Sequence, residues 1–222
     1  MFSAIAPRYD LLNHVLSFNV DRLWWRRAAH TFTHILKRPE ASALDLCCGT
    51  CDMTLALARL RPANAAPLLA ADFARPMLAR AAAKVADRNI RVLESDALQM
   101  PLPDASLDLI VSAFGFRNLA DYEAGLREIY RLLRPGGEVG VLDFSEPRGW
   151  LGKIYRIYFR HVLPRIGTLI SGVRGPYSYL PASVARFPEP PEMLERMKAA
   201  GFREVSWTPY SFGIAGLFRG KK

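Results

Sequence analysis

The stretch that decides the fold is Ala43-Leu44-Asp45-Leu46-Cys47-Cys48-Gly49-Thr50-Cys51-Asp52. Its apolar first half is typical of a buried strand, and a turn with a glycine follows. The amphipathic segment that begins at Met53 then changes the hydrophobic period from two to about 3.6 residues, which predicts a strand, a tight loop and a helix. Such a junction presents unpaired backbone N–H groups, and its glycine lets a ligand approach the backbone. We therefore expect it to bind a small polar or anionic ligand.

The glycine pattern of this loop narrows the class of ligand. Dinucleotide-binding proteins carry G-x-G-x-x-G, whereas here Gly49 is followed by Cys51 at the place of the second glycine. A nicotinamide or flavin cofactor is therefore poorly supported, and a nucleoside-type ligand remains.

The length and composition of the chain fit one α/β domain. Half of its 222 residues are apolar, which is enough for a full core. The first residues lack a signal-peptide pattern, and no apolar run approaches the roughly 18 residues that span a bilayer. The three cysteines form one cluster, unlike a secreted disulfide framework. We therefore expect a single cytoplasmic domain over residues 1–222.

Strand-like and helix-like segments alternate along most of the chain. The expected strands are 44–47, 68–71, 90–94, 107–114, 138–144, 204–209 and 213–219, and the expected helices begin at Asp52, Arg75, Asp121 and Glu189. This alternation predicts a mostly parallel sheet with helices on both faces. Pro135-Gly136-Gly137 is expected to end the third helix and to lead into the next strand. Two segments stand outside the alternation, a helical N-terminal cap over 1–36 and an insertion over 148–187.

The candidate ligand site lies at the carboxyl ends of the strands, where open α/β sheets bind their ligands. The residues expected there are Gly49, Thr50, Asp72, Asp96 and Ala97. An acid at the end of the second strand, about twenty residues after the glycine loop, is placed to hold a ribose diol. Asp96 can accept from an exocyclic amine, so the set describes adenosine. Singly, each acid is explained equally well as a helix cap, and their shared edge favours a ligand.

The positive charge of the chain is concentrated near its end. Residues 1–147 hold 17 Lys/Arg and 17 Asp/Glu, whereas residues 148–187 hold seven basic residues and no acidic ones. Aromatic residues are interleaved with the basic ones, and the apolar positions recur at helical spacing. This composition suits an anionic surface, either lipid headgroups or nucleic acid. The alternative is that the basic side chains cover a core while their charges are solvated.

Motifs spread along the whole chain carry a family resemblance. They are Tyr9-Asp-Leu-Leu-Asn13 with Ser17-Phe18, Leu44 to Asp52, Phe114-Gly-Phe-Arg-Asn118, Leu133-Arg-Pro-Gly-Gly137, Asp143-Phe-Ser145, Ser178-Tyr-Leu180 and Phe187-Pro188. Together they resemble the ubiquinone/menaquinone-biosynthesis C-methyltransferases. The resemblance implies a class I, Rossmann-like methyltransferase fold with a seven-stranded sheet, S-adenosylmethionine as methyl donor, and methylation of the ring of a polyprenylated quinol. It also implies that Thr50, Asp72, Asp96 and Ala97 contact the cofactor.

The resemblance implies a function for the basic segment 148–187. The substrate of this family carries a prenyl tail that stays in the membrane. We therefore expect residues 148–187 to form a lid that touches an anionic membrane surface transiently and admits the quinol head. The lead-in Ala6-Pro7-Arg8-Tyr9-Asp10 resembles the menaquinone branch, which favours demethylmenaquinol over a ubiquinol precursor. A homodimer is left open.

Some positions depart from the family pattern. Cys51 stands where the family usually has glycine, and its side chain is expected to intrude where the backbone approaches the cofactor. Ala113 stands where a serine often lies, so that contact is not assigned. Ala182 and Phe218 replace a common Glu and His, which leaves any role of those two groups open.

The chemistry that the resemblance implies makes demands on the site. Methylation of a quinol carbon is a displacement at a sulfonium, and it needs an electron-rich ring. A neighbouring hydroxyl must lose or share its proton, and the developing phenolate needs a donor or cation aimed at its oxygen. Our hypothesis is that Arg117 stabilises the phenolate and Asn118 orients the hydroxyl. Tyr9 and Asp10 would cover the ring or relay the proton.

Arg117 also has a purely structural interpretation. It can pair with Asp121 or Glu123 in the segment that follows and so fix the loop. Near-normal turnover after Arg117→Lys would contradict the phenolate role, because the fork geometry of the guanidinium would then not matter.

Other classes of function fit parts of the chain. An RNA methyltransferase would use the basic segment, but the sequence shows no recognisable RNA-binding module, paired catalytic cysteine or Asn-Pro-Pro-Tyr motif, so we expect no nucleic-acid partner. A thioredoxin-type protein would use Cys48-Gly-Thr-Cys51 as a C-x-x-C pair, but it leaves the acids at the strand ends unexplained. A narrower hypothesis is that a Cys48–Cys51 disulfide distorts the loop and stops the enzyme. Three clustered cysteines would need a fourth ligand to hold zinc, and we expect no metal.

Overall fold

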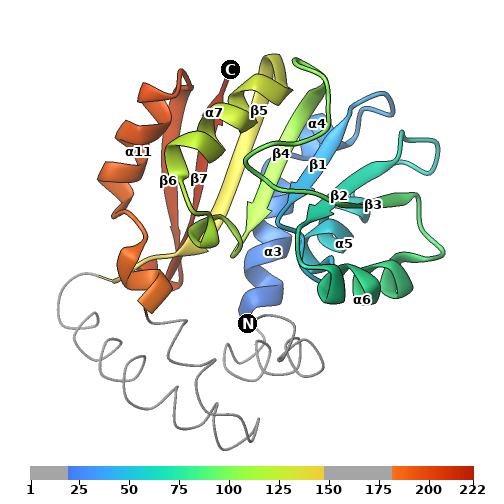
Figure 1. Ribbon diagram of the computed structural model, residues 1–222, viewed down its shortest axis with the longest axis horizontal. Coiled ribbons are helices and arrows are strands. Elements are labelled where there is room, and N and C mark those ends of the chain that lie inside the picture. Colours follow the sequence, from blue (N-terminus) through green and yellow to red (C-terminus); the bar gives the residue numbers. More distant parts are fainter. Residues whose placement is uncertain (1–19, 148–181) are drawn as a thin grey trace, which may run out of the picture.

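The computed structural model describes residues 20–147 and 182–222 and is built on one seven-stranded sheet (Figure 1). The strand order is β3-β2-β1-β4-β5-β7-β6. The strands are β1 Ala43–Leu46, β2 Leu68–Asp72, β3 Ile90–Glu94, β4 Leu107–Ala113, β5 Leu133–Phe144, β6 Arg203–Tyr210 and β7 Ala215–Lys221. The first five run parallel, and β7 is antiparallel to both β5 and β6. The expected sheet, mostly parallel and closed by two later strands, is confirmed.

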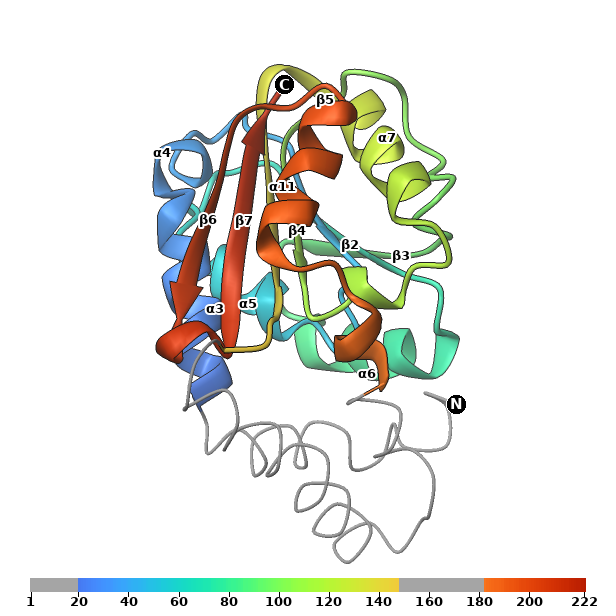
Figure 2. The ribbon, with the colours of Figure 1, turned by 90° about the vertical axis from the view of Figure 1, so that its left-hand side faces the viewer.

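Helices cover both faces of this sheet, as Figure 2 shows. They are α3 Val20–Thr31, α4 Thr33–Leu36, α5 Asp52–Ala58, α6 Arg75–Val85, α7 Tyr122–Leu132 and α11 Pro190–Ala199. Leu109 and Val111 of β4 pack with α3 and α5, whereas Ile110 between them packs with α7 and α11. Side chains alternate between the faces of a strand, so a continuous apolar run such as β4 is what a sheet buried on both sides requires.

One predicted boundary is wrong in an informative way. Pro135-Gly136-Gly137 lies inside β5, which begins at Leu133, rather than between the helix and the strand. Leu107 pairs with Leu133 before the register shifts, and pairing resumes between Leu109 and Glu138. The glycines therefore form an irregularity within the strand, with Gly136 at a positive φ of 82°.

The carboxyl ends of β1 to β5 meet at one edge of the sheet, the lower edge in Figure 1. Helix α3 begins at this edge, and η3, the turn Ser211–Gly213 between β6 and β7, lies there too. The N-terminal cap expected over 1–36 is described from Val20 onward, as α3 and α4. Tyr9, Asp10 and the insertion as far as residue 181 lie outside the described residues. Within the described ranges, no helix is long and apolar enough to cross a membrane.

Candidate active site

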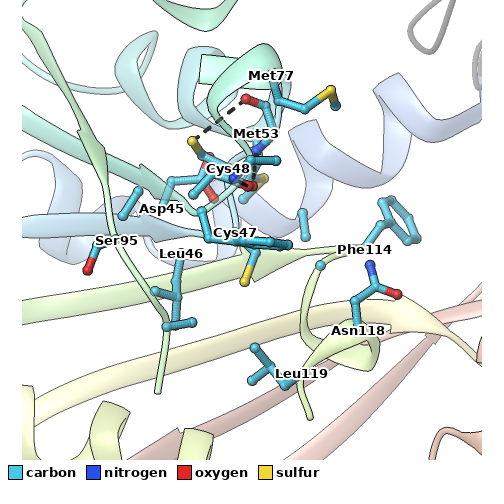
Figure 3. A pocket seen from close by; sticks show the side chains of 18 of the residues that line it. Asp45, Leu46, Cys47, Cys48, Met53, Met77, Ser95, Phe114, Asn118 and Leu119 are labelled. Atoms are coloured by element: carbon cyan, nitrogen blue, oxygen red, sulfur yellow. Dashed lines mark hydrogen bonds between the residues drawn. The ribbon is translucent and has the colours of Figure 1, made fainter. Parts of the chain in front are cut away.

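A cavity of about 350 Å³ opens at the edge where β1 to β4 end (Figure 3). It is lined by parts of segments 45–53, 71–77, 95–98 and 113–120, and by Trp25 of α3. The residues that the sequence predicted for a cofactor all line it: Gly49, Thr50, Asp72, Asp96 and Ala97. Asn118 lines it as well. The topology thus brings together groups that are far apart in the chain.

The loop after β1 has an unusual backbone. Cys47, Gly49 and Cys51 have positive φ values of 59°, 54° and 69°, which favour glycine over other residues. The loop is tied to β2 by two hydrogen bonds, one of them from the Cys48 backbone N–H to the Ala71 carbonyl at 2.9 Å. The Gly49 backbone N–H donates the other hydrogen bond, to the carboxylate of Asp72.

Asp72 at the end of β2 organises the neighbouring backbone. Its Oδ2 accepts from the Gly49 N–H at 2.9 Å, and its Oδ1 accepts from the Ala74 N–H at 2.8 Å. Burial raises the pKa of Asp72, and the backbone hydrogen bonds from Ala74 and Gly49 partly oppose the rise. A carboxylate has about four acceptor positions, so Asp72 can hold the loop and still accept from a ligand.

The end of β3 contributes a second acid to the cavity. Asp96 is exposed, and its Oδ1 accepts from the Leu98 N–H at 2.9 Å. Ala97 beside it is buried and lies among the apolar core residues. This pair combines an acceptor with an apolar surface, an arrangement suited to the edge and face of a nucleobase.

Cys51 does not intrude into the cavity, contrary to the expectation from the sequence. Its side chain is fully buried and packs with Ala70, Leu78 and Ala81 behind the loop. Cys51 does not line the cavity, although its neighbours Thr50 and Asp52 do. The cost of a cysteine here is the left-handed backbone conformation rather than a clash with a ligand.

Asp45 in the middle of β1 is a site residue that the sequence reasoning missed. It is fully buried, lines the cavity, and its Oδ2 accepts from the Thr54 hydroxyl at 2.5 Å. Its Oδ1 is buried with no hydrogen-bond partner in the part of the chain that the structure describes. Burial raises the pKa of Asp45 well above the usual range, and the hydrogen bond from Thr54 only partly opposes this. The acidic residue within the apolar run of β1 could have indicated a site, because a buried acid almost always has a partner or a ligand.

The segment after β4 presents Asn118 to the cavity. It contains Phe114 at a φ of 59° and the short 3-10 helix η1, Phe116–Asn118. Gly115 allows this segment to pass close to the first loop, because a Cβ there would lie 2.4 Å from the Cβ of Cys47. Phe114, which lies near Asn118 in Figure 3, and Trp25 add aromatic side chains to the lining.

Arg117 is placed differently from the expectation. Its side chain is 4% exposed and does not line the cavity. Its Nη1 donates to Asp143 Oδ1 at 3.0 Å and to the Phe114 carbonyl, and its Nε donates to the Ser183 hydroxyl at 3.3 Å. The Arg117 backbone N–H also donates to Asp143 Oδ2, at 3.1 Å.

The acidic partner of Arg117 is therefore Asp143 of β5, not Asp121 or Glu123. Asp121 caps α7 by accepting from the Ala124 N–H at 2.9 Å, and Glu123 pairs with Arg196. The guanidinium is held inside the protein, where it fixes the loop that carries Asn118. Direct contact between Arg117 and a substrate oxygen gains no support from this position.

The cavity is lined by carboxyl groups that can bind a cationic ligand. Asp45, Asp52, Asp72 and Asp96 line it, and of these Asp52 is paired with Lys84 at 2.6 Å. A doubly wound sheet, a glycine loop after β1 and acids at the ends of β2 and β3 form an adenosine-type site, and the family match identifies the class as a class I methyltransferase that uses S-adenosylmethionine. The chain belongs to the ubiE/COQ5 methyltransferase family, whose family model matches residues 1–222.

Curated relatives and solved structures agree with this assignment. A demethylmenaquinone methyltransferase of Thermus thermophilus is 48% identical and aligns over the whole of both chains. One of Deinococcus radiodurans is 47% identical over all of this chain and 91% of its own. A ubiquinone/menaquinone biosynthesis C-methyltransferase of Geobacter sulfurreducens is 42% identical over all of this chain and 87% of its own.

The solved structures show the fold alone. A methyltransferase from Aquifex aeolicus that depends on S-adenosylmethionine superposes with a TM-score of 0.65 at 20% identity, covering 90% of this chain and 92% of that one. A [4+2]-cyclase, SpnF, reaches 0.68 at 17% identity, covering 100% and 93%. The predicted family, fold, enzyme class and methyl donor are confirmed by these findings together.

Proposed function

We propose that this enzyme methylates a ring carbon of demethylmenaquinol to give menaquinol. The observation that carries the proposal is a cavity lined both by carboxyl groups, those of Asp45, Asp72 and Asp96, and by the aromatic side chains of Trp25 and Phe114. Two full-length relatives at 47% and 48% identity bear the name demethylmenaquinone methyltransferase. The equivalent methylation of a ubiquinol precursor is the second candidate, because the Geobacter relative's name includes ubiquinone.

The carboxyl groups of the cavity fit the polar groups of S-adenosylmethionine. Asp45 Oδ1 is a buried acceptor with no partner in residues 20–147 and 182–222, and it would receive the cofactor's ammonium group. Asp72 would accept from the ribose hydroxyls, while Asp96 and Ala97 would hold the base. Gly49 and Thr50 would supply the floor of the site. When bound, the cofactor supplies an electrophilic methyl group on a sulfonium.

On the acceptor side, Asn118 would orient the quinol hydroxyl next to the ring carbon. Arg117 would act through the loop, because its pairing with Asp143 and Ser183 fixes the segment that presents Asn118. This role is one of positioning. Tyr9 and Asp10 stay proposed as the groups that cover the ring or relay its proton.

The membrane is the proposed source of the substrate. Leu23, Phe73 and Phe212 are large apolar side chains that are 61%, 70% and 87% exposed. Leu23 lies in the first turn of α3, Phe73 lines the cavity and Phe212 lies in η3, so all three are at the edge that holds the cavity. Exposed Arg22 and Arg26 flank Leu23 on α3. Apolar side chains beside basic ones suit an anionic lipid surface, from which the prenylated quinol would enter.

The test of the proposed function is methyl transfer in liposomes. Labelled S-adenosylmethionine would be offered with reduced demethylmenaquinone, with a ubiquinone precursor, and with bulk RNA in parallel reactions. Label in demethylmenaquinone alone is the expected result. Label in the ubiquinone precursor alone would select the second candidate, and label in RNA would overturn both.

A further inference from the structure

Two cysteines flank Gly49 and Thr50, which are among the residues that line the cavity after β1. Cys48 and Cys51 are the first and last residues of a four-residue turn, closed by a hydrogen bond of 2.8 Å from the Cys51 N–H to the Cys48 carbonyl. The Cα atoms at the ends of such a turn lie within about 7 Å. A disulfide requires Cα atoms about 4.4–6.8 Å apart, a range that a turn of this kind allows.

Both side chains also lie in the same buried cluster, together with Ala70 and Leu78. A side-chain hydrogen bond from Cys48 lowers the pKa of the Cys51 thiol, with help from Thr54 and from the charge of Lys84, while the pKa of Cys48 is raised. Cys51 is therefore the more acidic thiol of the pair, and its thiolate can serve as the base for Cys48.

An oxidant from solvent can reach only one of the two sulfurs directly. Cys48 is 8% exposed and lines the cavity, as Figure 3 shows, whereas Cys51 is fully buried behind it. A small oxidant that enters the cavity therefore meets Cys48 first, and Cys51 is placed to react second.

We propose that Cys48 and Cys51 form a reversible disulfide that switches off cofactor binding when hydrogen peroxide enters the cavity. The Cys51 thiolate acts as the base and takes the proton of Cys48 while the Cys48 sulfur attacks peroxide, so that an S–O bond forms, the O–O bond breaks, and hydroxide leaves. Cys51 then attacks the sulfenic sulfur, so that the S–S bond forms, the S–O bond breaks, and water leaves with the Cys51 proton. The two sulfurs lose two electrons in all, and peroxide is reduced to the level of water.

The consequence for the cofactor loop follows from geometry. A disulfide brings its sulfurs to about 2.05 Å, so the turn must tighten around Gly49 and Thr50. Gly49 also donates to Asp72 at 2.9 Å, and a shift of the loop strains this hydrogen bond. The effect on binding rests on the proposed function, since it assumes that these residues hold the cofactor.

The experiment compares the reduced and peroxide-treated full-length protein. Intact mass spectrometry should show the loss of two hydrogen atoms without added oxygen, and a dithiol reductant should reverse it. Calorimetric binding of S-adenosylhomocysteine should be at least tenfold weaker after oxidation and should return on reduction. Binding by the reduced protein is the check on the proposed function. Its absence would refute the cofactor site, whereas the mass change tests the disulfide separately.

A matched set of variants assigns the bond. Cys47→Ser should keep the disulfide, because Cys47 faces Gly115 and takes no part in the pair. Cys48→Ser and Cys51→Ser should lose it, and the reversibility of the native protein stands even where a variant fails to fold. A disulfide that persists without Cys51, or an oxidised protein that binds as tightly as the reduced one, would overturn the proposal.

Discussion

At the scale of single residues, the buried carboxyl of Asp45 lowers the stability of the folded protein but is proposed to bind the cofactor. Its carboxyl is buried and its pKa is raised well above the usual range, so the charged form is costly in the folded state. A raised pKa means that the carboxyl contributes stability at low pH, and that this contribution is lost as pH rises through the folded-state pKa. At neutral pH the cofactor-free protein therefore carries a buried group that opposes its folding.

Asp45→Asn should consequently raise the Tm of the cofactor-free protein by a few degrees at neutral pH, and by less as the pH falls. The same change should weaken S-adenosylmethionine binding by about tenfold or more, because an amide cannot match a carboxylate as acceptor for an ammonium. Thermal scans across pH and calorimetry would measure the two effects. Asp96→Asn is the control, since Asp96 is exposed and should weaken binding without raising Tm. A lower Tm for Asp45→Asn would contradict the argument.

At the scale of loops and strands, the site depends on how closely two loops approach. A Cβ on Gly115 would lie 2.4 Å from the Cys47 Cβ and 3.0 Å from the Cys47 carbonyl oxygen. Gly115→Ala should therefore destabilise the protein by about 1–3 kcal/mol and weaken cofactor binding, because the loops after β1 and β4 must move apart.

The double variant Cys47→Gly, Gly115→Ala tests whether the clash with Cys47 causes the expected loss of stability and binding in Gly115→Ala. It removes the closer clash and places glycine at a positive φ of 59°, so it should recover part of the lost stability and binding. Urea unfolding and S-adenosylhomocysteine titration of the two single variants and the double variant complete the cycle. Purely additive losses would show that the contact with Cys47 is not the reason for the glycine.

The buried pair of Arg117 and Asp143 distinguishes a positioning role from direct stabilisation of a phenolate. Arg117→Lys keeps the charge but cannot make the forked hydrogen bonds to Asp143, Phe114 and Ser183, so kcat should fall about tenfold or more while cofactor affinity stays nearly unchanged. If Arg117 only positions the loop, kcat should fall equally at every pH. A displacement of the pH–rate profile to higher pH would instead show that Arg117 touches the phenolate.

Most elements of this fold could be predicted from the sequence, because strand and helix periods are local properties. The alternation along the chain gave the strands, and the rule that ligands sit at carboxyl ends gave Asp72 and Asp96. The partner of Arg117 could not be predicted, since Asp143 is 26 residues away on the neighbouring strand. Likewise, the direction of the Cys51 side chain depends on a positive φ that no residue name reveals.

At the scale of the whole molecule, one edge of the sheet combines the cavity with exposed apolar side chains. Leu23 lies on the first turn of α3, and Phe212 lies in η3, beyond the carboxyl end of β5. Single exposed apolar side chains are common on protein surfaces, so it is their shared edge with the cavity that favours contact with lipid. The opposite edge carries exposed basic residues, among them Lys37 and Arg59, without such apolar neighbours in the described ranges. We therefore expect substitutions at the cavity edge to weaken lipid binding and substitutions at the opposite edge to leave it nearly unchanged.

The native protein should sediment with liposomes of acidic lipid at low salt and be released as salt screens the charges. Replacing Leu23 and Phe212 by serine should reduce the bound fraction severalfold at all salt concentrations, because the loss is apolar. Replacing Arg22 and Arg26 by serine should reduce it mainly at low salt.

The charge-matched control replaces Lys37 and Arg59 by serine at the opposite edge, and it should bind lipid almost as the native protein does. An equal loss of lipid binding in the Arg22/Arg26 variant and the Lys37/Arg59 variant would mean that net charge, rather than this edge, attracts the membrane. Methyl transfer to a water-soluble quinol with a short tail should be unaffected by the Leu23 and Phe212 changes, because that substrate needs no membrane. A matching loss of activity with the soluble quinol would show instead that these side chains support the active site itself.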